Sequence, residues 1–377
     1  MRQDLSSGEP PSPAALSLFS GLLRDAVALA ASGVASPEDI DLAMQLGAGH
    51  PVGPLTLLRE LDPAVRAGAG LPEPPAVTGV SDGSPQDADN EPWARPVGVA
   101  GTGTMASGIV EALVRAGVPT VVLGRSQASA DRLRAAVATS MDAAVAKGRL
   151  TGRLRDGALN HLSLTTDPGA LADCGHVIEA VAEDLAVKRE LLALLDRSLP
   201  ERTILATNTS SLTVAEIRAG LPARRTVLAL HFFNPAKAMK LVEVAGADEG
   251  VLDAACGWIR RIGKVPVRCG DERGFVVNRL LIPYLNDAVR ALGSGAFTAA
   301  EADALMREAL GHPMGPFELI DLIGTDVTAA AQTMLHAASG DARLKPADGL
   351  LALVDGGRLG RKSGAGFHDH SAARSGA

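Results

Sequence analysis

The stretch Val97-Gly-Val-Ala-Gly-Thr-Gly-Thr-Met-Ala106 decides the fold of this chain. Its first four residues have the apolar character of a short buried strand, and residues from about 105 to 116 have the pattern of a helix. The glycines therefore fall on a turn between strand and helix, where they permit a tight bend and let the backbone approach a pyrophosphate. The N-terminus of the helix would face the phosphates. We expect dinucleotide contacts from Gly101, Gly103, Thr104, Met105 and Ala106.

Strands and helices alternate after this stretch. Strands are expected at Thr120–Leu123, His161–Thr165, His176–Val181 and Thr203–Thr207, and a helical hairpin at Ala128–Gly148 and Thr151–Leu159. Such a βαβ series builds a parallel sheet with helices on its faces. The sequence therefore predicts an α/β domain of the Rossmann-like, dinucleotide-binding kind.

The end of the second predicted strand bears on the choice between NAD and NADP. An acidic residue about 20 positions after the glycines usually binds the ribose 2′-hydroxyl of NAD. Here the chain reads Leu123-Gly-Arg-Ser126, without an acid. Arg125 and Ser126 can hold a 2′-phosphate, which favours NADP. The alternative is that Arg125 is a solvated loop cation.

A second informative stretch runs from His231 to Glu243. The apolar run 226–230 predicts a strand with His231 at its carboxyl end, Asn234-Pro235 predicts a turn, and residues 239–244 predict a second strand. Two strands joined by a turn can bring Glu243 beside His231. A carboxylate on one nitrogen of a neutral imidazole fixes its tautomer and prepares the other nitrogen to take a proton. The alternative is a structural histidine in the core beside a surface glutamate.

Polar residues follow several of the predicted parallel strands, namely Glu183, Asn208, Ser210 and His231. Ligands of such sheets bind beyond the carboxyl ends of the strands. We therefore expect these side chains to line one pocket. Ser210 can alternatively be the N-cap of the helix that follows its strand.

The chain closes with a predicted all-helical domain. A helix at Val251–Ile262 and a strand at Val265–Arg268 complete the sheet domain. Asp271 to Gly274 resembles a hinge, and helices are expected throughout from Phe275 onward.

The N-terminal part contains an internal repeat. Residues 1–13 look disordered, and residues 14–61 read as helices, the first at Ala14–Ser32 and the second starting at the N-cap Ser36. When the numbering is shifted by 262, residues 23–57 match residues 285–319 without a gap, including Gly49-His-Pro51 and Gly311-His-Pro313. Both segments then represent one helical unit. Residues 62–95 lack apolar periodicity and are expected to be a linker.

Composition bounds the remaining possibilities. The chain has 377 residues, 46% of them hydrophobic, which is enough for two or three domains. A net charge of -7 argues against nucleic acid as the main partner. Three cysteines without a CxxC pair fit buried thiols in a cytoplasmic protein. We expect no signal peptide and no apolar run long enough to span a membrane. No metal site is expected.

The order of motifs resembles the 3-hydroxyacyl-CoA dehydrogenases, in particular the bacterial 3-hydroxybutyryl-CoA type, over residues 96 to about 370. The matching motifs are Gly101-x-Gly-x-Met-Ala-x-Gly108, Glu179-Ala-Val-Ala-Glu183 with Lys188, Asn208-Thr-Ser-Ser-Leu212, His231-Phe-Phe-Asn-Pro235, Leu241-Val-Glu-Val244, Gly274-Phe-Val-Val-Asn-Arg279, Gly311-His-Pro-Met-Gly-Pro-Phe317 and Gly360-Arg-Lys-Ser-Gly-Ala-Gly-Phe367. The resemblance implies hydride transfer between C3 of a 3-hydroxyacyl thioester and a nicotinamide, as in fatty acid metabolism.

The resemblance also assigns roles to residues. It implies that His231 is the general base, that Glu243 is its carboxylate partner, and that Ser210 and Asn278 bind the substrate. It places Glu183, Lys188, Asn208 and Asn234 beside the cofactor and active site. Three residues depart from the family pattern: Arg125, which replaces the acid for the adenosine ribose, Lys237 and Arg273. Lys237 can meet the phosphates of a thioester carrier, although we favour a solvated lysine.

The resemblance finally suggests an organisation and its alternatives. We expect domains at 1–61 (a degenerate copy of the C-terminal helical domain), 62–95 (linker), 96–272 (Rossmann-like) and 273–377 (helical). Family members generally pair through that helical domain, so we expect either an intrachain pseudo-dimer or a homodimer. Leu16 stands 262 positions before Asn278, so the N-terminal copy lacks this group. Alternatives to a CoA substrate are a carrier-protein-bound hydroxyacyl group and a non-catalytic, cofactor-binding role.

Overall fold

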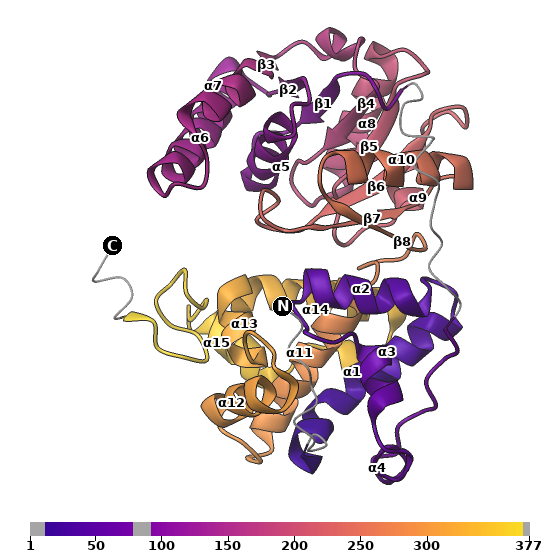
Figure 1. Cartoon of the computed structure of the whole chain (residues 1–377), viewed down its shortest axis with the longest axis vertical. Helices are drawn as coiled ribbons and strands as arrows, with labels where there is room; N and C mark the ends of the chain where they lie inside the picture. Colours follow the sequence, from indigo (N-terminus) through magenta and orange to yellow (C-terminus); the bar gives the residue numbers. More distant parts are fainter. Residues whose placement is uncertain (1–11, 78–91, 372–377) are drawn as a thin grey trace. The chain divides into compact units, whose positions relative to one another are not determined.

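The computed structural model describes residues 12–77 and 92–371 of the chain. These residues form two compact units, each considered by itself (Figure 1). The sheet unit runs from Pro92 to Phe275. The helical unit combines the described residues up to Val77 with those from Val276 onward.

One eight-stranded sheet organises the sheet unit. Its strands are β1 (Val97–Ala100), β2 (Thr120–Leu123), β3 (Leu162–Thr165), β4 (His176–Glu179), β5 (Ile204–Thr207), β6 (Val227–Phe232), β7 (Leu241–Ala245) and β8 (Val265–Arg268). Their order in the sheet is β3-β2-β1-β4-β5-β6-β7-β8. Neighbouring strands are parallel except for β6 and β7, which are antiparallel. The predicted Rossmann-like parallel sheet is therefore confirmed.

The helices of this unit connect the strands. They are α5 (Thr104–Arg115), α6 (Gln127–Ala146), α7 (Gly152–Asn160), the 3-10 helix η2 (Pro168–Leu171), α8 (Leu185–Ser198), α9 (Val214–Arg218) and α10 (Glu249–Arg261). Side chains at their starts accept the first backbone N–H groups, for example Thr213 at α9 and Ser126 at α6. Caps of this kind satisfy donors that have no partner within the helix.

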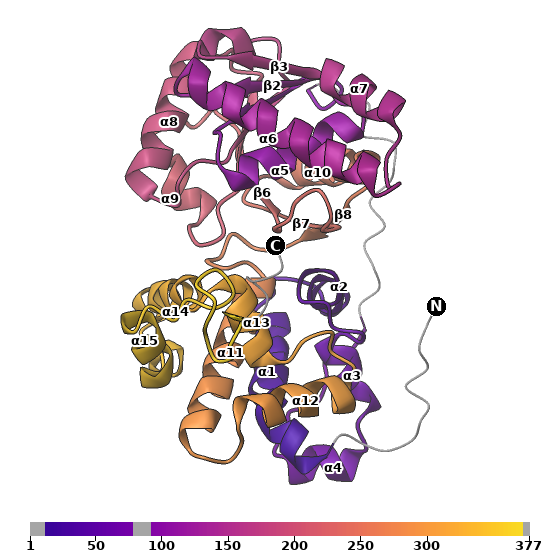
Figure 2. The ribbon, with the colours of Figure 1, turned by 90° about the vertical axis from the view of Figure 1, so that its left-hand side faces the viewer.

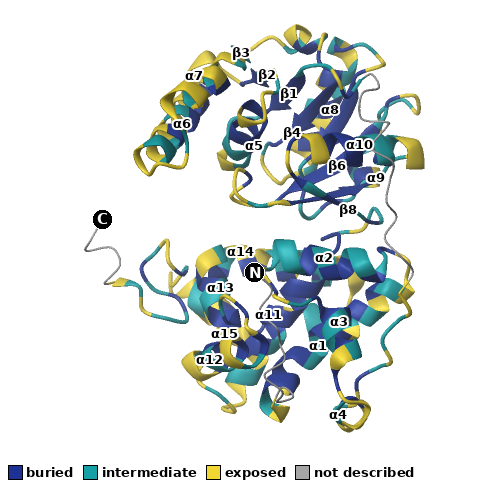
Figure 3. Cartoon of the chain, in the orientation of Figure 1, coloured by how far each residue is buried: buried dark blue, intermediate teal, exposed yellow. Residues whose placement is uncertain are grey.

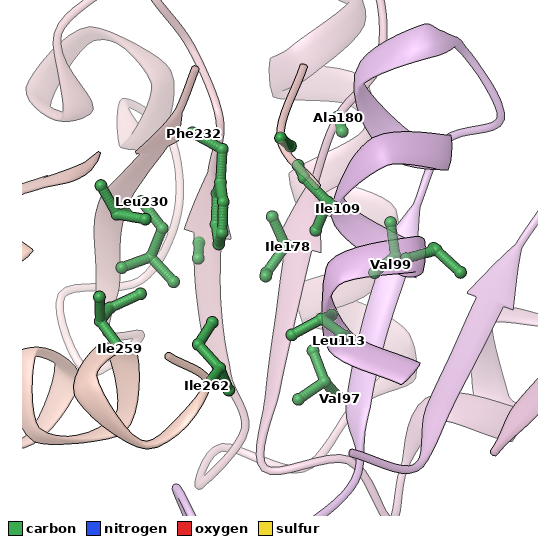
Figure 4. Packing of buried hydrophobic residues seen from close by; sticks show 14 of the residues in the cluster. Val97, Val99, Ile109, Leu113, Ile178, Ala180, Leu230, Phe232, Ile259 and Ile262 are labelled. Atoms are coloured by element: carbon green, nitrogen blue, oxygen red, sulfur yellow. The ribbon is translucent and has the colours of Figure 1, made fainter. Parts of the chain in front are cut away.

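Apolar residues on one face of the sheet form the core of the unit. Side chains of alternate strand residues belong to it: Val97 and Val99 lie beside Leu113 and Ile109 of α5, and Leu230 lies beside Ile259 of α10 (Figure 4). Because successive residues of a strand point to opposite faces, the residues between them point to the other face. His231 lies between the core residues Leu230 and Phe232, so it points away from this core.

The helical unit is built from two segments far apart in the sequence. The first contains α1 (Pro13–Ala31), α2 (Pro37–Gly47), α3 (Pro54–Glu60) and α4 (Pro63–Gly68). The second contains α11 (Val277–Gly293), α12 (Ala299–Leu310), α13 (Pro316–Ile323), α14 (Thr325–Ser339), the 3-10 helix η3 (Ala342–Leu344) and α15 (Asp348–Asp355). Helices α1 and α11 pack side by side in its centre (Figure 2). Their facing sides are buried, whereas the outer helices keep exposed faces (Figure 3).

Several expectations about the N-terminal part need correction. Residues 1–13 were expected to lack structure, but Ser12 caps α1 and Pro13 begins it, while residues 1–11 lie outside the described part. The expected linker 62–95 contains α4, whose N-cap is Asp62, and Trp93, which is buried in the sheet unit. Residues 78–91 of that segment lie outside the described part.

The expected domain plan also changes in two respects. The N-terminal helices and those after Phe275 form one compact unit rather than two domains, because α1 packs along α11. The C-terminal part is not helical throughout, since isolated β-bridges join Ala365 to Gly360 and to Asp369.

Helix α1 contradicts the expectation about membrane-spanning length. It has 19 residues with a mean hydropathy of 1.5, so by length and composition alone it could cross a membrane. One such helix is weak support for a membrane span, because a core helix of a soluble protein passes the same test. The apolar face of α1 packs against α11 and α3 within the helical unit, which accounts for its composition.

Candidate active site

The carboxyl ends of the central strands bring the predicted polar residues to one edge of the sheet. Strand pairing sets Ala100 of β1 level with Glu179 of β4, Glu179 level with Thr207 of β5, and Thr207 level with Ala229 of β6. The glycine turn, the loops carrying Glu183 and Ser210, and His231 all follow this line. Ligands of α/β sheets bind at this edge.

His231 and Glu243 form a buried pair at the ends of β6 and β7. They are direct partners in the antiparallel register of these strands. The imidazole Nδ1 lies 2.7 Å from Oε2 of Glu243. His231 is 5% exposed and Glu243 is fully buried, so Glu243 is not the surface glutamate of the alternative interpretation. A proton on Nδ1 is held by the carboxylate, which leaves Nε2 as the nitrogen that can accept a proton.

Aromatic rings and a backbone tie surround this pair. The ring of Phe233 lies 4.5 Å from that of His231, and the ring of Phe275 lies 5.5 Å away, measured between centroids. The side-chain carbonyl of Asn208 accepts the backbone N–H of Phe232 at 2.8 Å. Asn208 therefore ties the end of β5 to the end of β6, which fixes the strand that carries the histidine.

Glu183 organises the loop that carries Ser210. Its Oε1 accepts the backbone N–H groups of Ser210 at 2.9 Å and Ser211 at 3.0 Å, and the hydroxyls of Thr209 and Ser211 at 2.6 Å each. Its Oε2 pairs with Lys188 at 3.1 Å. Burial opposes the charge of Glu183, but Lys188 and these hydroxyls outweigh it and lower its pKa to about 2. The carboxylate is therefore charged near neutral pH and holds the loop in place.

A buried ion pair lies beneath this loop. Lys188 Nζ contacts both carboxylate oxygens of Glu179, at 2.9 and 3.0 Å, and the Thr207 hydroxyl donates to the same carboxylate at 2.6 Å. Lys188 is among the residues predicted from the sequence, whereas Glu179, Thr207 and Thr209 were not predicted as supporting residues. The alternation of β4 and β5 was the available signal, because it points Glu179 and Thr207 to the same face.

The glycine turn fits a dinucleotide. Gly101 has φ 132°, and a Cβ there would collide with the carbonyl oxygen of Ala180, so the turn requires glycine. A Cβ on Gly103 would meet no protein atom within 4 Å. Protein packing therefore does not explain this second glycine, whereas close approach of a pyrophosphate does. Thr104 and Met105 begin α5 beside it, and Ala106 is buried against the sheet.

The other predicted cofactor residues lie in loops at the same edge. Arg125 is exposed just after β2. Ser126 is the N-cap of α6, and its hydroxyl accepts the N–H of Ser129 at 3.3 Å. Asn234 is exposed in the turn between β6 and β7, before a cis bond to Pro235.

Two of the residues that depart from the family pattern, Lys237 and Arg273, have structural partners. Lys237 is exposed, as the favoured prediction of a solvated lysine has it, and it also pairs with Glu111 at 3.4 Å and bonds the hydroxyl of Ser140. Arg273 donates to the carbonyl of Ser211 at 3.1 Å and pairs with Glu216. It thus supports the Ser210 loop from the end of the sheet unit.

Asn278, the remaining predicted site residue, does not belong to the sheet unit. It is the second residue of α11 and belongs to the helical unit. Its predicted contact with substrate stays a prediction. Among the described residues, no group of three or more His, Cys, Asp or Glu side chains is arranged to hold a metal ion.

Comparison with known proteins agrees with this geometry. Residues 96–272 match the family model of the 3-hydroxyacyl-CoA dehydrogenase NAD-binding domain. Residues 17–69 and 274–370 match the model of the C-terminal domain of the same family. The chain belongs to the 3-hydroxyacyl-CoA dehydrogenase family. Its sheet unit is accordingly an NAD-binding domain, and the chain is an oxidoreductase of the kind that acts on CH–OH groups.

Individual relatives align with about three quarters of this chain. A 3-hydroxybutyryl-CoA dehydrogenase of Mycobacterium tuberculosis is 40% identical over 279 residues, which is 73% of this chain and 98% of the relative. A 3-hydroxyadipyl-CoA dehydrogenase of Escherichia coli is 40% identical over 74% of this chain and 59% of its own length. The crystal structure of M. tuberculosis FadB2 has a TM-score of 0.70 at 40% identity, covering 73% of this chain and 98% of that one. These alignments leave about a quarter of this dehydrogenase uncovered.

Proposed function

We propose that the protein catalyses the reversible, NAD(P)-dependent oxidation of a 3-hydroxyacyl-CoA, such as 3-hydroxybutyryl-CoA, to the 3-oxoacyl-CoA. The observation that carries this proposal is the buried His231–Glu243 pair at the carboxyl edge of an NAD-binding sheet. The substrate class is supported by the names of relatives that are about 40% identical. We also place the protein in the cytoplasm, a proposal supported by its three free, buried cysteines.

The chemistry follows from the residue types. The glycine turn at Gly101 and Gly103 would hold the nicotinamide cofactor, which would supply the acceptor for the hydride from C3 of the alcohol. Nε2 of His231 takes the proton of the C3 hydroxyl, so the C–H and O–H bonds break as the C=O bond forms. Glu243 stabilises the imidazolium that results, because its carboxylate lies on Nδ1. A non-catalytic binding protein of this fold has no need for such a buried pair.

Ser210 and Asn278 are proposed to hold the oxygen on C3. Ser210 is only partly buried and stands on the loop that Glu183 fixes. A hydroxyl or amide donor stabilises the carbonyl oxygen as charge develops there. The hydroxyl of Thr213, rather than that of Ser210, caps α9, which answers the alternative that Ser210 is a helix cap.

A preference for NADP is the finer proposal. Arg125 follows β2, where an acid would bind the ribose of NAD, and it is exposed. Charged hydrogen bonds contribute roughly 1.5–3 kcal/mol, so Arg125 can shift the preference by about 10- to 100-fold. Ser126 supports this role less than expected, because it is engaged as the cap of α6.

The test is a cofactor assay. Acetoacetyl-CoA is mixed with the purified protein and either NADH or NADPH, and the absorbance of the reduced cofactor is followed. We expect turnover with the parent protein and a loss of roughly 10²–10⁴-fold in kcat for His231→Ala. Near-normal turnover of that variant would rule out His231 as the base. Absence of turnover by a protein that binds NAD would favour a carrier-protein-bound substrate, and faster turnover with NADH would reject the role of Arg125.

A further inference from the structure

Two segments of the helical unit make the same internal contacts. Asp41 accepts the backbone N–H groups of the residues 14 and 15 positions later, at 2.7 and 2.9 Å. Asp303 stands 262 positions further on and accepts the N–H groups of the residues 14 and 15 positions later, at 2.9 and 3.2 Å. The glycines Gly53 and Gly315 each lie against one of these aspartates, where a Cβ would collide. The helices α1 to α3 (residues 13–60, called the N-terminal segment) thus repeat the contacts of α11 to α13.

The contacts between the two segments are reciprocal. A Cβ placed on Gly49 would lie 3.1 Å from Cγ of Pro313, and a Cβ placed on Gly311 would lie 3.3 Å from Cγ of Pro51. Gly49 of the first segment thus contacts Pro313 of the second, and their counterparts, Gly311 and Pro51, contact each other in the same way. This is the pattern of an isologous interface, in which two copies are related by a two-fold axis.

The residue next to a two-fold axis would contact its own counterpart, and one pair in the helical unit does so. His50 and His312 are counterparts, and their rings stack with centroids 4.2 Å apart and an interplanar angle of 11°. Both imidazoles are buried. A self-paired residue of this kind is what a two-fold axis through the interface requires.

An aromatic contact and a shared arginine also join the two segments. Phe19 of α1 packs edge-on against Tyr284 of α11, with ring centroids 5.5 Å apart. The related carboxylates Asp25 and Asp287 both bind Arg343, at 2.6 Å and at 2.5 Å. Two equivalent acids thus share a single arginine.

We propose that the N-terminal segment occupies, within its own chain, the face through which two copies of the helical unit would otherwise pair. The protein is then a pseudo-dimer of helical domains and a monomer in solution, with one sheet unit per chain. Leu16 is buried at the position that matches Asn278, so the segment supplies packing without the predicted substrate-binding amide. This inference does not depend on the proposed reaction, because none of its contacts involves the sheet unit.

The mass of the intact protein is the first test. Light scattering of the full chain should give the single-chain mass of 38.6 kDa at every concentration. A stable mass of two chains would overturn the proposal.

Cross-linking separates docking within a chain from exchange between chains. In the full chain carrying His50→Cys and His312→Cys, a short thiol cross-linker should join the two positions. The product should run at the mass of one chain under denaturing conditions. A product found only at the mass of two chains would show that the segment docks on a second copy, which contradicts the proposal.

A matched pair of variants tests whether the covered face is self-complementary. Phe19→Asp changes only the N-terminal side of the Phe19–Tyr284 contact, so it should release the segment and shift the full chain to the mass of two chains. Tyr284→Asp damages the covered face itself and should leave a single-chain mass. Equal masses for the two variants would refute self-pairing, and the cross-linking result stands even if one variant fails to fold.

Discussion

Histidine is buried in both units of the molecule, but its neighbours differ. In the sheet unit, Nδ1 of His231 lies 2.7 Å from the Glu243 carboxylate. In the helical unit, His50 and His312 stack on each other. Burial lowers the pKa of His312 to about 4, and burial together with the neighbouring imidazole lowers the pKa of His50 well below 6.5.

The difference teaches which histidine can do acid–base chemistry. A carboxylate beside a buried imidazole compensates the positive charge that a proton transfer creates. A second imidazole offers no such compensation, so His50 and His312 are held neutral and serve packing. Burial alone therefore does not mark a catalytic histidine, whereas its partner does.

The largest expected effect comes from taking the carboxylate away from His231. Glu243→Gln places an amide beside Nδ1, and an amide N–H that donates there moves the imidazole proton to Nε2, the nitrogen that must accept the substrate proton. We expect kcat to fall by up to roughly 10⁴-fold, by the precedent of the equivalent change in a serine protease triad. Turnover of acetoacetyl-CoA with NADH measures it.

The matched control for this variant is His50→Gln in the helical unit. It changes a buried histidine that has no carboxylate partner, and it should leave kcat within a fewfold of the parent. Comparable losses in both variants would show that the contrast between the two histidine environments has no catalytic meaning.

The part of the site that follows from strand patterns could be predicted from sequence. The apolar run before His231 and the turn at Asn234-Pro235 place Glu243 opposite the histidine, because the antiparallel register is short and local. The glycine turn is equally local, and its strand, turn and helix appear where they were predicted.

What depends on contacts distant in sequence could not be predicted. Glu183 was expected beside the cofactor, but its hydrogen bonds to Ser210 and Ser211 depend on how two loops meet, 27 and 28 residues apart. The ion pair of Lys237 could not be predicted because Lys237 stands in the turn between β6 and β7, whereas its partner Glu111 lies on α5, far away in the sequence. The apolar composition of α1 is explained only by its packing on α11.

A smaller effect should appear in the pH dependence of stability. The folded protein keeps His50 and His312 neutral because their pKa values are lowered, whereas the unfolded chain takes up protons below about pH 6.5. Their contribution to stability is complete above that pH and is lost as the pH falls toward 4. For His312 alone the loss should reach roughly 3 kcal/mol.

Thermal melts of the parent and of His50→Gln/His312→Gln between pH 7 and 4.5 measure this contribution. Carboxylates titrate in both proteins, so the difference between the two profiles isolates the stacked pair. We expect a flatter profile for the double variant. Parallel profiles would mean that the stacked imidazoles do not resist protonation.

The smallest expected effects concern carboxylates that serve the backbone instead of a histidine base. Asp41 and Asp303 accept pairs of N–H groups in the two repeated segments, and each has one further donor: the Thr56 hydroxyl at 2.7 Å and the His368 ring at 2.7 Å. Replacing either aspartate by asparagine turns one acceptor into a donor that faces another donor. We expect each substitution to lower the free energy of unfolding by roughly 1–3 kcal/mol, because a buried N–H group loses its partner.

Urea denaturation of Asp41→Asn and Asp303→Asn compares the two segments directly. Similar losses are expected if both segments are essential parts of one helical unit. For Asp41→Asn, kcat per folded molecule should stay near the parent value, since the hydrogen-bond partners of Asp41 are Leu55 and Thr56 of the N-terminal segment. A loss for Asp303→Asn with none for Asp41→Asn would mean that the N-terminal segment is only loosely docked. It would then be unable to take the place of a second copy, so this small difference in stability bears directly on the pseudo-dimer.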